Sequence, residues 1–477
     1  MADPTDSPAT FSPTAAAGSS DGPIGPPDAD PSEGSSPNAG VAAPSAAVTA
    51  PSAAAGQNAG ADLARRRFFR QFAGDVASTA ATVLGAAQAL QRTSAELAGA
   101  ILDPSRAALG EGSVATVVPV MDPIAAPVFR TSFLVDPGAI RFIDQRALPE
   151  AVVEHISISA AEVIWAIRNE VVVGGPAIGQ AAAIGLALTA ARATSSLPYA
   201  RRATLRGAAA GLKHNNPMVA SLGWAVDRVM AAYEAVGELD DDGEKIADAI
   251  QAEADAIVAA ATVEHGRLVD VGLGLLDGLP RTSDGPLRLL VHGPSGTLAG
   301  GQFGTALAIA VAAHHAEREV QVIVPEGRPG LFGARISCWE LASAGVPHIL
   351  VLDAAAAGIV ASGGVDAVLV APDRVAVNGD VAAPIGSYAL AASARDRGVP
   401  FLVCMTIGSL DPTVADGSDL SVGRREVPDL ARIGEAARVP RSTDVIAPFE
   451  DVVPAALVSE YVSATGLRRP PFESVAS

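Results

Sequence analysis

Apolar residues in the C-terminal part of the chain come in short continuous runs, separated by segments with a helical period. Fully apolar strands that alternate with helices are typical of a parallel sheet covered on both faces. The pattern therefore predicts a doubly wound α/β domain over residues 286–477, with ligands beyond the carboxyl ends of the strands. The five runs, each of strand length, are residues 287–292, 320–324, 348–352, 367–370 and 401–404.

Residues 157–261 carry apolar positions at helical spacing instead. Ser159 and Glu162 form a capping-box pattern, which predicts that a helix begins between them. A glycine loop at residues 173–176 leads into a second helix, and a third is expected after the Asn-Asn-Pro sequence at residues 215–217. A helical domain is therefore expected ahead of the α/β domain.

The first part of the chain has two different compositions. Residues 1–60 consist mainly of Ala, Pro, Ser, Gly and Asp, too few apolar groups to offset the entropy of ordering, so a disordered tail is expected. Residues 61–104 have apolar side chains at steps of three and four, which predicts a long amphipathic helix that offers a face to a protein partner. Arg65, Arg66 and Arg67 before apolar residues resemble a twin-arginine export signal, the alternative to a cytoplasmic location.

Composition excludes several function classes. The 477 residues have a formal net charge of −19, which disfavours nucleic-acid binding because the phosphate backbone would be repelled. Two cysteines without metal-ligand spacing cannot form a disulfide framework or a structural zinc site, and no metal is expected. Lys213 and Lys245 are the only lysines. No run of about 18 strongly apolar residues occurs, so no transmembrane span is expected.

The residues at the predicted strand ends are the candidates for a site. Ser295, Gly296 and Thr297 follow the first strand and precede a helix, where backbone amides and hydroxyls can bind a phosphate. The alternative is a tight strand-to-helix turn that needs glycine for backbone reasons alone. No GxxxxGK[ST] sequence occurs, so nucleoside triphosphate chemistry is not supported.

Charged residues follow the second and fourth strands. Arg328 is shaped for a bidentate contact with a phosphate. Asp373 stands where a carboxyl group can act as a general acid or base, with Asn378 and Asp380 nearby in the sequence. The alternative for Asp373 is a carboxylate that caps a helix or braces a loop.

Several motifs resemble one known family. The chain is similar over residues 127–477 to the S-methyl-5-thioribose-1-phosphate isomerase family, which shares its fold with ribose-1,5-bisphosphate isomerase and with regulatory subunits of translation initiation factor 2B. The segments that carry the resemblance are residues 142–150, 171–179, 217–228, 300–307, 328–341, 371–380 and 469–472.

The resemblance implies a helical N-terminal domain over residues 127–285, a Rossmann-like C-terminal domain over residues 286–477, a homodimer, and a sugar-phosphate crevice between the domains. It implies aldose–ketose isomerisation without a metal or organic cofactor, with Asp373 as the acid/base. The residues predicted to bind the substrate are Gly174, Gly175, Ser295, Gly296, Thr297, Arg328, Asn378 and Asp380, of which Ser295, Thr297 and Arg328 would replace the phosphate ligands of the family.

Other positions depart from the family pattern. The family has a cysteine where this chain has Gly293, and two arginines where it has Val173 and Asn216. The family's glutamine is Phe332 here, and its Asn-Lys pair is Ala383 and Pro384. Three hypotheses therefore stay open: a sugar-phosphate isomerase, a relative that binds a different small ligand, and a non-catalytic regulatory or scaffold protein.

Overall fold

The computed structural model describes residues 131–279, 285–420, 432–433, 436–437, 440, 443–444 and 446–472. They belong to one compact unit of the chain, residues 113–477. The predicted tail over residues 1–60, the predicted helix over residues 61–104 and the arginine cluster all lie outside the described residues.

The described chain begins with a small antiparallel sheet in the order β1-β2-β3. Its strands are β1 (Phe133–Asp136), β2 (Ala139–Ile143) and β3 (Glu154–Ser157). The expectation of a helical N-terminal domain omits this sheet, because strands of four or five residues leave too short a pattern to separate from loops.

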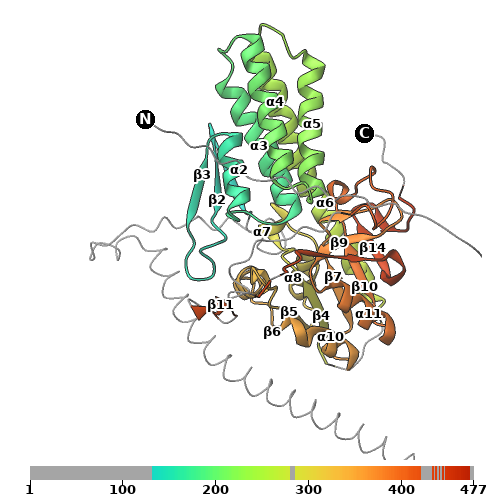
Figure 1. Cartoon of the computed structure of the whole chain (residues 1–477). Helices are drawn as coiled ribbons and strands as arrows, with labels where there is room; N and C mark the ends of the chain where they lie inside the picture. The colour runs from blue at the N-terminus through green and yellow to red at the C-terminus, as the bar shows by residue number, and fades with distance from the viewer. Residues whose placement is uncertain are drawn as a thin grey trace, which may run out of the picture. The chain divides into compact units, whose positions relative to one another are not determined.

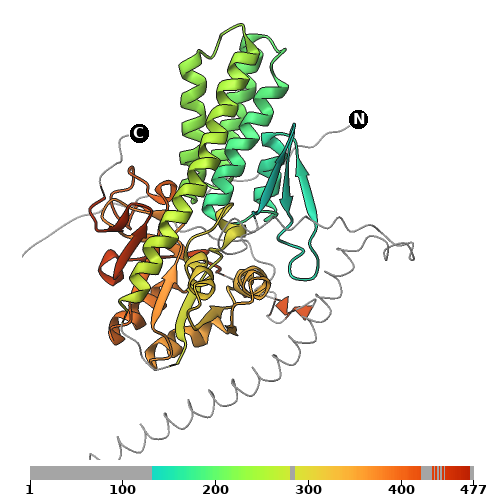
Figure 2. The same cartoon turned by 180° about the vertical axis from the view of Figure 1, so that it is seen from behind.

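Five helices form an upright bundle beyond this sheet, shown in green in Figure 1 and from behind in Figure 2. They are α2 (Ala160–Arg168), α3 (Gly175–Arg192), α4 (Pro198–Asn215), α5 (Ala220–Val236) and α6 (Gly243–Asp277). The predicted cap of α2 is confirmed, since the Ser159 hydroxyl accepts a hydrogen bond from the Glu162 amide at 3.4 Å.

Helix α3 is buried on nearly all sides, which its small residues allow. At Gly179 it approaches α5 so closely that an added Cβ would lie 2.6 Å from the Ser221 carbonyl oxygen. Helix α6 has 35 residues, about 50 Å at 1.5 Å per residue. Its Ile246 and Ile250 belong to the core of the bundle, and its Leu268 and Leu276 belong to the core under the large sheet.

The large sheet has seven strands in the order β15-β14-β10-β7-β4-β5-β6, of which only β15 is antiparallel. All five predicted strands are present, and β14 and β15 are additions. The strands are β4 (Leu287–His292), β5 (Val320–Pro325), β6 (His348–Val351), β7 (Ala367–Val370), β10 (Phe401–Cys404), β14 (Glu460–Ser463) and β15 (Gly466–Arg468).

The six parallel strands have the Rossmann order, which reverses direction between β4 and β7. Alternate residues of β4 face opposite layers: Leu289 packs on the side of α8 (Ala306–His315), and Leu290 on the side of α10 (Asp353–Ala361) and α11 (Ser387–Arg397). The predicted doubly wound α/β domain is therefore confirmed.

Smaller elements surround the ends of these strands. A three-stranded sheet has the order β13-β9-β8, with β8 (Arg374–Val375), β9 (Val381–Pro384) and β13 (Glu450–Val453). The remaining elements are α7 (Thr297–Gly300), α9 (Cys338–Ser343), β11 (Arg432–Ile433), β12 (Ala436–Ala437) and the turns η2 (Gly333–Ser337), η3 (Ile407–Ser409) and η4 (Ala455–Leu457). Among the described residues, no helix is both long and apolar enough to cross a membrane.

The close contact of α3 with α5 gives a test of the packing. Gly179→Ala is expected to lower the free energy of unfolding by about 1–3 kcal/mol, because the new methyl group meets the Ser221 backbone. Gly223→Ala, in α5 with nothing within 4 Å of the added Cβ, is the matched control and should raise stability by about 0.4–1 kcal/mol. Urea unfolding of both variants measures the difference. Equal effects would contradict the packing described for α3.

Candidate functional site

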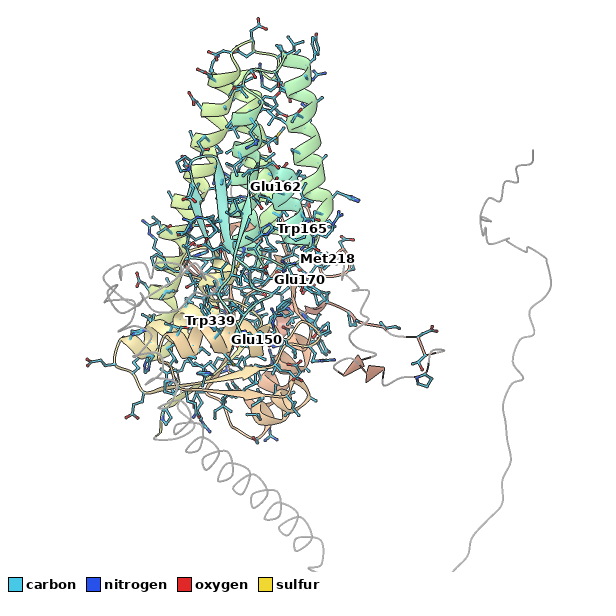
Figure 3. The ribbon with its side chains drawn as sticks, turned by 90° about the vertical axis from the view of Figure 1, so that its left-hand side faces the viewer. Glu150, Glu162, Trp165, Glu170, Met218 and Trp339 are labelled. Atoms are coloured by element: carbon cyan, nitrogen blue, oxygen red, sulfur yellow. The ribbon has the colours of Figure 1, made fainter. Side chains whose placement is uncertain are left out.

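A cavity of about 360 Å³ opens where the strand order reverses between β4 and β7. This is the place at which ligands bind in doubly wound sheets. Its walls come from the loop before α3, the loop before α5, and the residues after β4, β5 and β7. Met218 and Glu170 also line it, and Figure 3 places both on the face where the helices meet the sheet domain.

Five of the nine predicted site residues line this cavity. They come from four separate parts of the chain and are Gly174, Gly175, Ser295, Arg328 and Asp373. Five of the six positions expected to depart from the family pattern lie there too, namely Val173, Asn216, Gly293, Phe332 and Pro384, and Ala383 does not. These residues therefore lie together in one cavity at the strand ends, and their contact with a ligand stays a prediction.

The other four predicted site residues do not line the cavity. Gly296 caps α7 and Thr297 is its first residue, and neither is among the residues that line the cavity. The Asn378 amide donates to the Asp380 carboxylate at 2.8 Å. Asp380 also accepts from the Gly417 and Ala455 amides at 2.9 and 2.8 Å, so its carboxylate joins three loops instead of facing a ligand.

The glycine turn after β4 is occupied by a carboxyl group of the protein. Glu340 of α9, whose carboxyl group is buried, accepts the Leu298 amide at 2.9 Å and also interacts with the Thr297 amide. A hydroxyl of the same turn is engaged as well, because Ser295 Oγ accepts from the Leu307 amide at 3.1 Å. Two amides of the turn are therefore engaged by a carboxyl group of the protein, and phosphate binding at Ser295, Gly296 and Thr297 stays a prediction.

Arg328 is the cation at the end of β5. Its backbone amide and that of Gly327 both donate to the Asp353 carboxylate, at 2.7 and 2.9 Å. Asp353 thus fixes the loop that presents Arg328 to the cavity. Within the described part of the chain, the Arg328 guanidinium has no ion-pair partner. It is therefore the group best placed to bind an anionic part of a ligand.

Asp373 is the carboxyl group at the end of β7. Its backbone joins two elements, since its amide donates to the Ala382 carbonyl at 3.0 Å and its carbonyl accepts from the Ala220 amide at 3.2 Å. Burial raises the pKa of Asp373, while a side-chain hydrogen bond with Glu450 and the charge of Arg374 act in the opposite direction. Burial, together with the nearby Asp373, strongly raises the pKa of Glu450.

His292, the last residue of β4, also lines the cavity. Its Nε2 lies 2.9 Å from the Ile385 carbonyl oxygen and therefore carries the proton that it donates. Its Nδ1 is then an acceptor, and it is buried with no hydrogen-bond partner among the described residues. Burial lowers the pKa of His292, so the imidazole is neutral and presents a lone pair.

Sequence reasoning missed His292 and Glu450. His292 could have been found from the sequence, because it is the last residue of a predicted strand and ligands bind at the carboxyl ends of parallel strands. Glu450 had a weaker signal, an acidic pair with Asp451 between apolar residues.

Gly293 and Pro384 close one wall of the cavity together. Gly293 has a φ of +79°, which residues with a side chain rarely adopt. A Cβ added there would lie 2.6 Å from Pro384 Cγ, well inside van der Waals contact. No side chain therefore fits at position 293 while Pro384 is present.

Metal binding is not supported by the arrangement of the described side chains. Nowhere in that part of the chain do three or more His, Cys, Asp or Glu residues group so that they can hold a metal ion. Cys404 is buried, and burial raises the pKa of its thiol far above the usual value, so it is not a thiolate at neutral pH.

The helical domain, the Rossmann-type sheet domain and the cavity at the strand reversal define the class of protein. Residues 171–470 match the Initiation factor 2 subunit family. Methylthioribose-1-phosphate isomerase of Chloroflexus aurantiacus is 37% identical over 334 residues, which are 70% of this chain and 94% of that protein. The enzyme of the same name from Gemmatimonas aurantiaca is 37% identical over 339 residues, 71% of this chain and 93% of its own length.

Solved structures give the same result. The 5-methylthioribose 1-phosphate isomerase of Pyrococcus horikoshii has a TM-score of 0.63 at 30% identity and covers 72% of this chain and 93% of its own. The delta subunit of translation initiation factor eIF-2B from A. fulgidus has a TM-score of 0.60 at 26% identity, over 72% and 96%. The chain belongs to the Initiation factor 2 subunit family, as the sequence resemblance implies.

The buried Glu340 gives a pH test of the turn. Burial raises the pKa of Glu340 from 4.5 to about 7, so the folded protein holds a proton that the unfolded chain releases above pH 4.5. Stability from this group is therefore present below pH 4.5 and is lost as the pH rises through 7, by an amount on the order of a few kcal/mol.

Glu340→Gln keeps an acceptor for the Leu298 amide and cannot ionise, so it should weaken this loss. Urea unfolding at pH 5 and at pH 8.5 measures the change for the wild type and the variant. The exposed Glu317→Gln serves as the control. The same pH dependence in all three proteins would contradict a buried, protonated Glu340.

Proposed function

We propose that this protein is an aldose–ketose isomerase of the methylthioribose-1-phosphate type. The observation that carries the proposal is that Asp373, a carboxyl group with a raised pKa, lines one cavity together with Arg328 at the strand reversal. A carboxyl group of this kind suits proton transfer, and a guanidinium with no competing carboxylate suits a phosphate. The names of the relatives support the same reaction class.

The chemistry assigns a part to each group. Opening of the furanose ring breaks the bond between C1 and the ring oxygen, which becomes a hydroxyl. Asp373 removes the hydrogen of C2 as a proton and returns it to C1, so that C2 becomes a ketone and C1 keeps the phosphate. The ring oxygen gains one proton and the C2 hydroxyl loses one, so substrate and product are isomers. The reaction therefore needs no oxidant or organic cofactor. Arg328 holds the phosphate throughout.

The departures from the family pattern shape this proposal. Because no side chain fits at position 293, no thiol can act there, and Asp373 is left as the acid/base. Position 173 has a valine, position 216 an asparagine and position 384 a proline, so Arg328 and Arg168 are the cations that line the cavity. We infer weaker phosphate binding than a site with more cations would give.

A specific observation favours a second candidate, a relative that acts on a ligand with a larger apolar part. Val173 and Phe332 belong to an apolar cluster that also contains Leu298 and Ile336. Two lining positions of the cavity thus present hydrocarbon, against which an apolar substituent of a ligand would be buried. The third hypothesis, a regulatory or scaffold protein, rests on residues 61–104, outside the described part of the chain.

We further propose that the protein forms a homodimer and acts in the cytoplasm, as the family resemblance implies. A protein partner at residues 61–104 is also an expectation. Sedimentation of the full chain and of a chain without residues 61–104 tests both the dimer and this segment.

Turnover tests the proposed reaction. Purified protein is incubated with methylthioribose 1-phosphate, and formation of the ketose is followed by NMR. The wild type should form it, and Asp373→Asn should lower kcat by about 10²–10⁴, because an amide cannot accept the C2 proton. Arg328→Ala should raise KM more than it lowers kcat, since it removes the phosphate contact.

Asp270→Asn, an exposed carboxylate of α6 far along the chain from the cavity residues, is the control and should keep full activity. No ketose from the wild type, or an unchanged kcat for Asp373→Asn, would overturn the proposal. Conversion of related sugars without a phosphate, but not of the phosphate ester, would favour the second candidate.

A further inference from the structure

We propose that Glu450 is a positioning residue of this site, which holds one shared proton against Asp373 and thereby orients the Asp373 carboxyl group. The inference rests on the proposed function for its catalytic part. Neither residue needs a ligand for the proton sharing itself, which makes the two parts separable by experiment.

The small sheet brings the two residues together from distant parts of the sequence. Glu450 is the first residue of β13 and lies opposite Pro384 of β9. On the other edge of β9, the Asp373 amide donates to the Ala382 carbonyl at 3.0 Å. Strands β8 and β13 thus flank β9 and carry both carboxyl groups to the end of β7, where Asp373 faces the cavity.

Glu450 has no other way to satisfy its side chain. The residue is 2% exposed, and no donor among the described residues reaches either of its carboxyl oxygens. Its side chain lies within hydrogen-bonding range of the Asp373 carboxyl group. Two ionised carboxylates are acceptors only, so a hydrogen bond between them requires that one of them carries a proton.

The charges around the pair favour a single negative charge. Arg374, next to Asp373 in the sequence, is the cation that acts on both carboxyl groups. Its guanidinium already forms an ion pair with Asp411 at 3.5 Å and donates to the Pro217 carbonyl. Because one cation faces three carboxyl groups, the site does not compensate a second charge on the Asp373–Glu450 pair.

This arrangement defines what Glu450 does during turnover. The protonated Glu450 carboxyl donates to one oxygen of Asp373, so the other oxygen is the one available on the cavity side. When Asp373 takes the C2 proton and returns it to C1, the proton of Glu450 stays within the pair. The number of protons on the enzyme is therefore the same before and after the reaction.

Two substitutions of Glu450 test this role through the pH profile of kcat. Glu450→Gln keeps a hydrogen-bond donor toward Asp373 but cannot ionise, so the loss of activity at alkaline pH should disappear. Glu450→Leu removes the donor and leaves Asp373 buried without it, so the acid limb should move up by about one pH unit or more and kcat at pH 7 should fall at least about tenfold. KM should stay within about twofold for both.

A purely structural role predicts something different. Both variants would then lose activity without a shift of either limb of the profile. Glu264→Gln, the same change at a partly buried glutamate that does not line the main cavity, is the control and should leave both limbs in place. Unmoved limbs in Glu450→Gln and Glu450→Leu would overturn the inference.

A measurement without substrate separates this inference from the proposed function. Infrared difference spectra at pH 8.5 report the C=O stretch of protonated carboxyl groups, at a pH above the pKa of about 7 of Glu264 and Glu340. The wild type should retain such a band, and Glu450→Gln should lose it. Absence of the band from the wild type would overturn the shared proton.

The combined outcomes are distinct. If the band behaves as expected but no sugar phosphate is converted, the shared proton stands and the proposed function fails together with the catalytic role of Glu450. If conversion occurs while the band and both limbs are unaffected by Glu450→Gln, the proposed function stands and the inference fails.

Discussion

Burial of apolar surface along α6 is the constraint on which the rest of this structure depends. One half of the helix packs in the core of the bundle through Ile246 and Ile250, and the other half packs under the large sheet through Leu268 and Leu276. Because a helix of 35 residues is stiff, these two cores cannot shift independently. Polar contacts then refine the junction, for example the Gln180 side chain, which donates to the Gly300 carbonyl at 2.8 Å.

The site is a product of that junction, since neither layer forms it alone. The loop before α3 and the loop before α5 supply one wall, and the ends of β4, β5 and β7 supply the other. The backbone of Asp373 is held from both sides, by Ala382 of the small sheet and by Ala220 at the start of α5. The raised pKa of its carboxyl group follows from this enclosure, because a charge away from water is disfavoured.

Local patterns in the sequence were enough to predict the inner strands of the sheet and the residues at their ends. Continuous apolar runs identified the five inner strands, and the rule for strand ends found Arg328 and Asp373. What it missed depends on pairing between distant segments. Glu340 occupies the turn at Thr297 from 43 positions further along the chain, and Glu450 reaches Asp373 only because β13 pairs with β9. No local spacing in the sequence encodes either contact. The turn at Gly296 and Thr297 was therefore predicted to contact a ligand, whereas in the structure it contacts the Glu340 carboxyl group.

The contact between Gly293 and Pro384 has a consequence for how this site can change over time. A side chain at position 293 clashes with the proline ring, so any larger residue there is blocked until position 384 changes first. The reverse order is open, because replacing the proline leaves a glycine that tolerates any neighbour. The order of substitution at these two positions therefore matters, because a change at position 293 is tolerated only after a change at position 384. A nucleophilic side chain at position 293 therefore requires an earlier substitution at position 384.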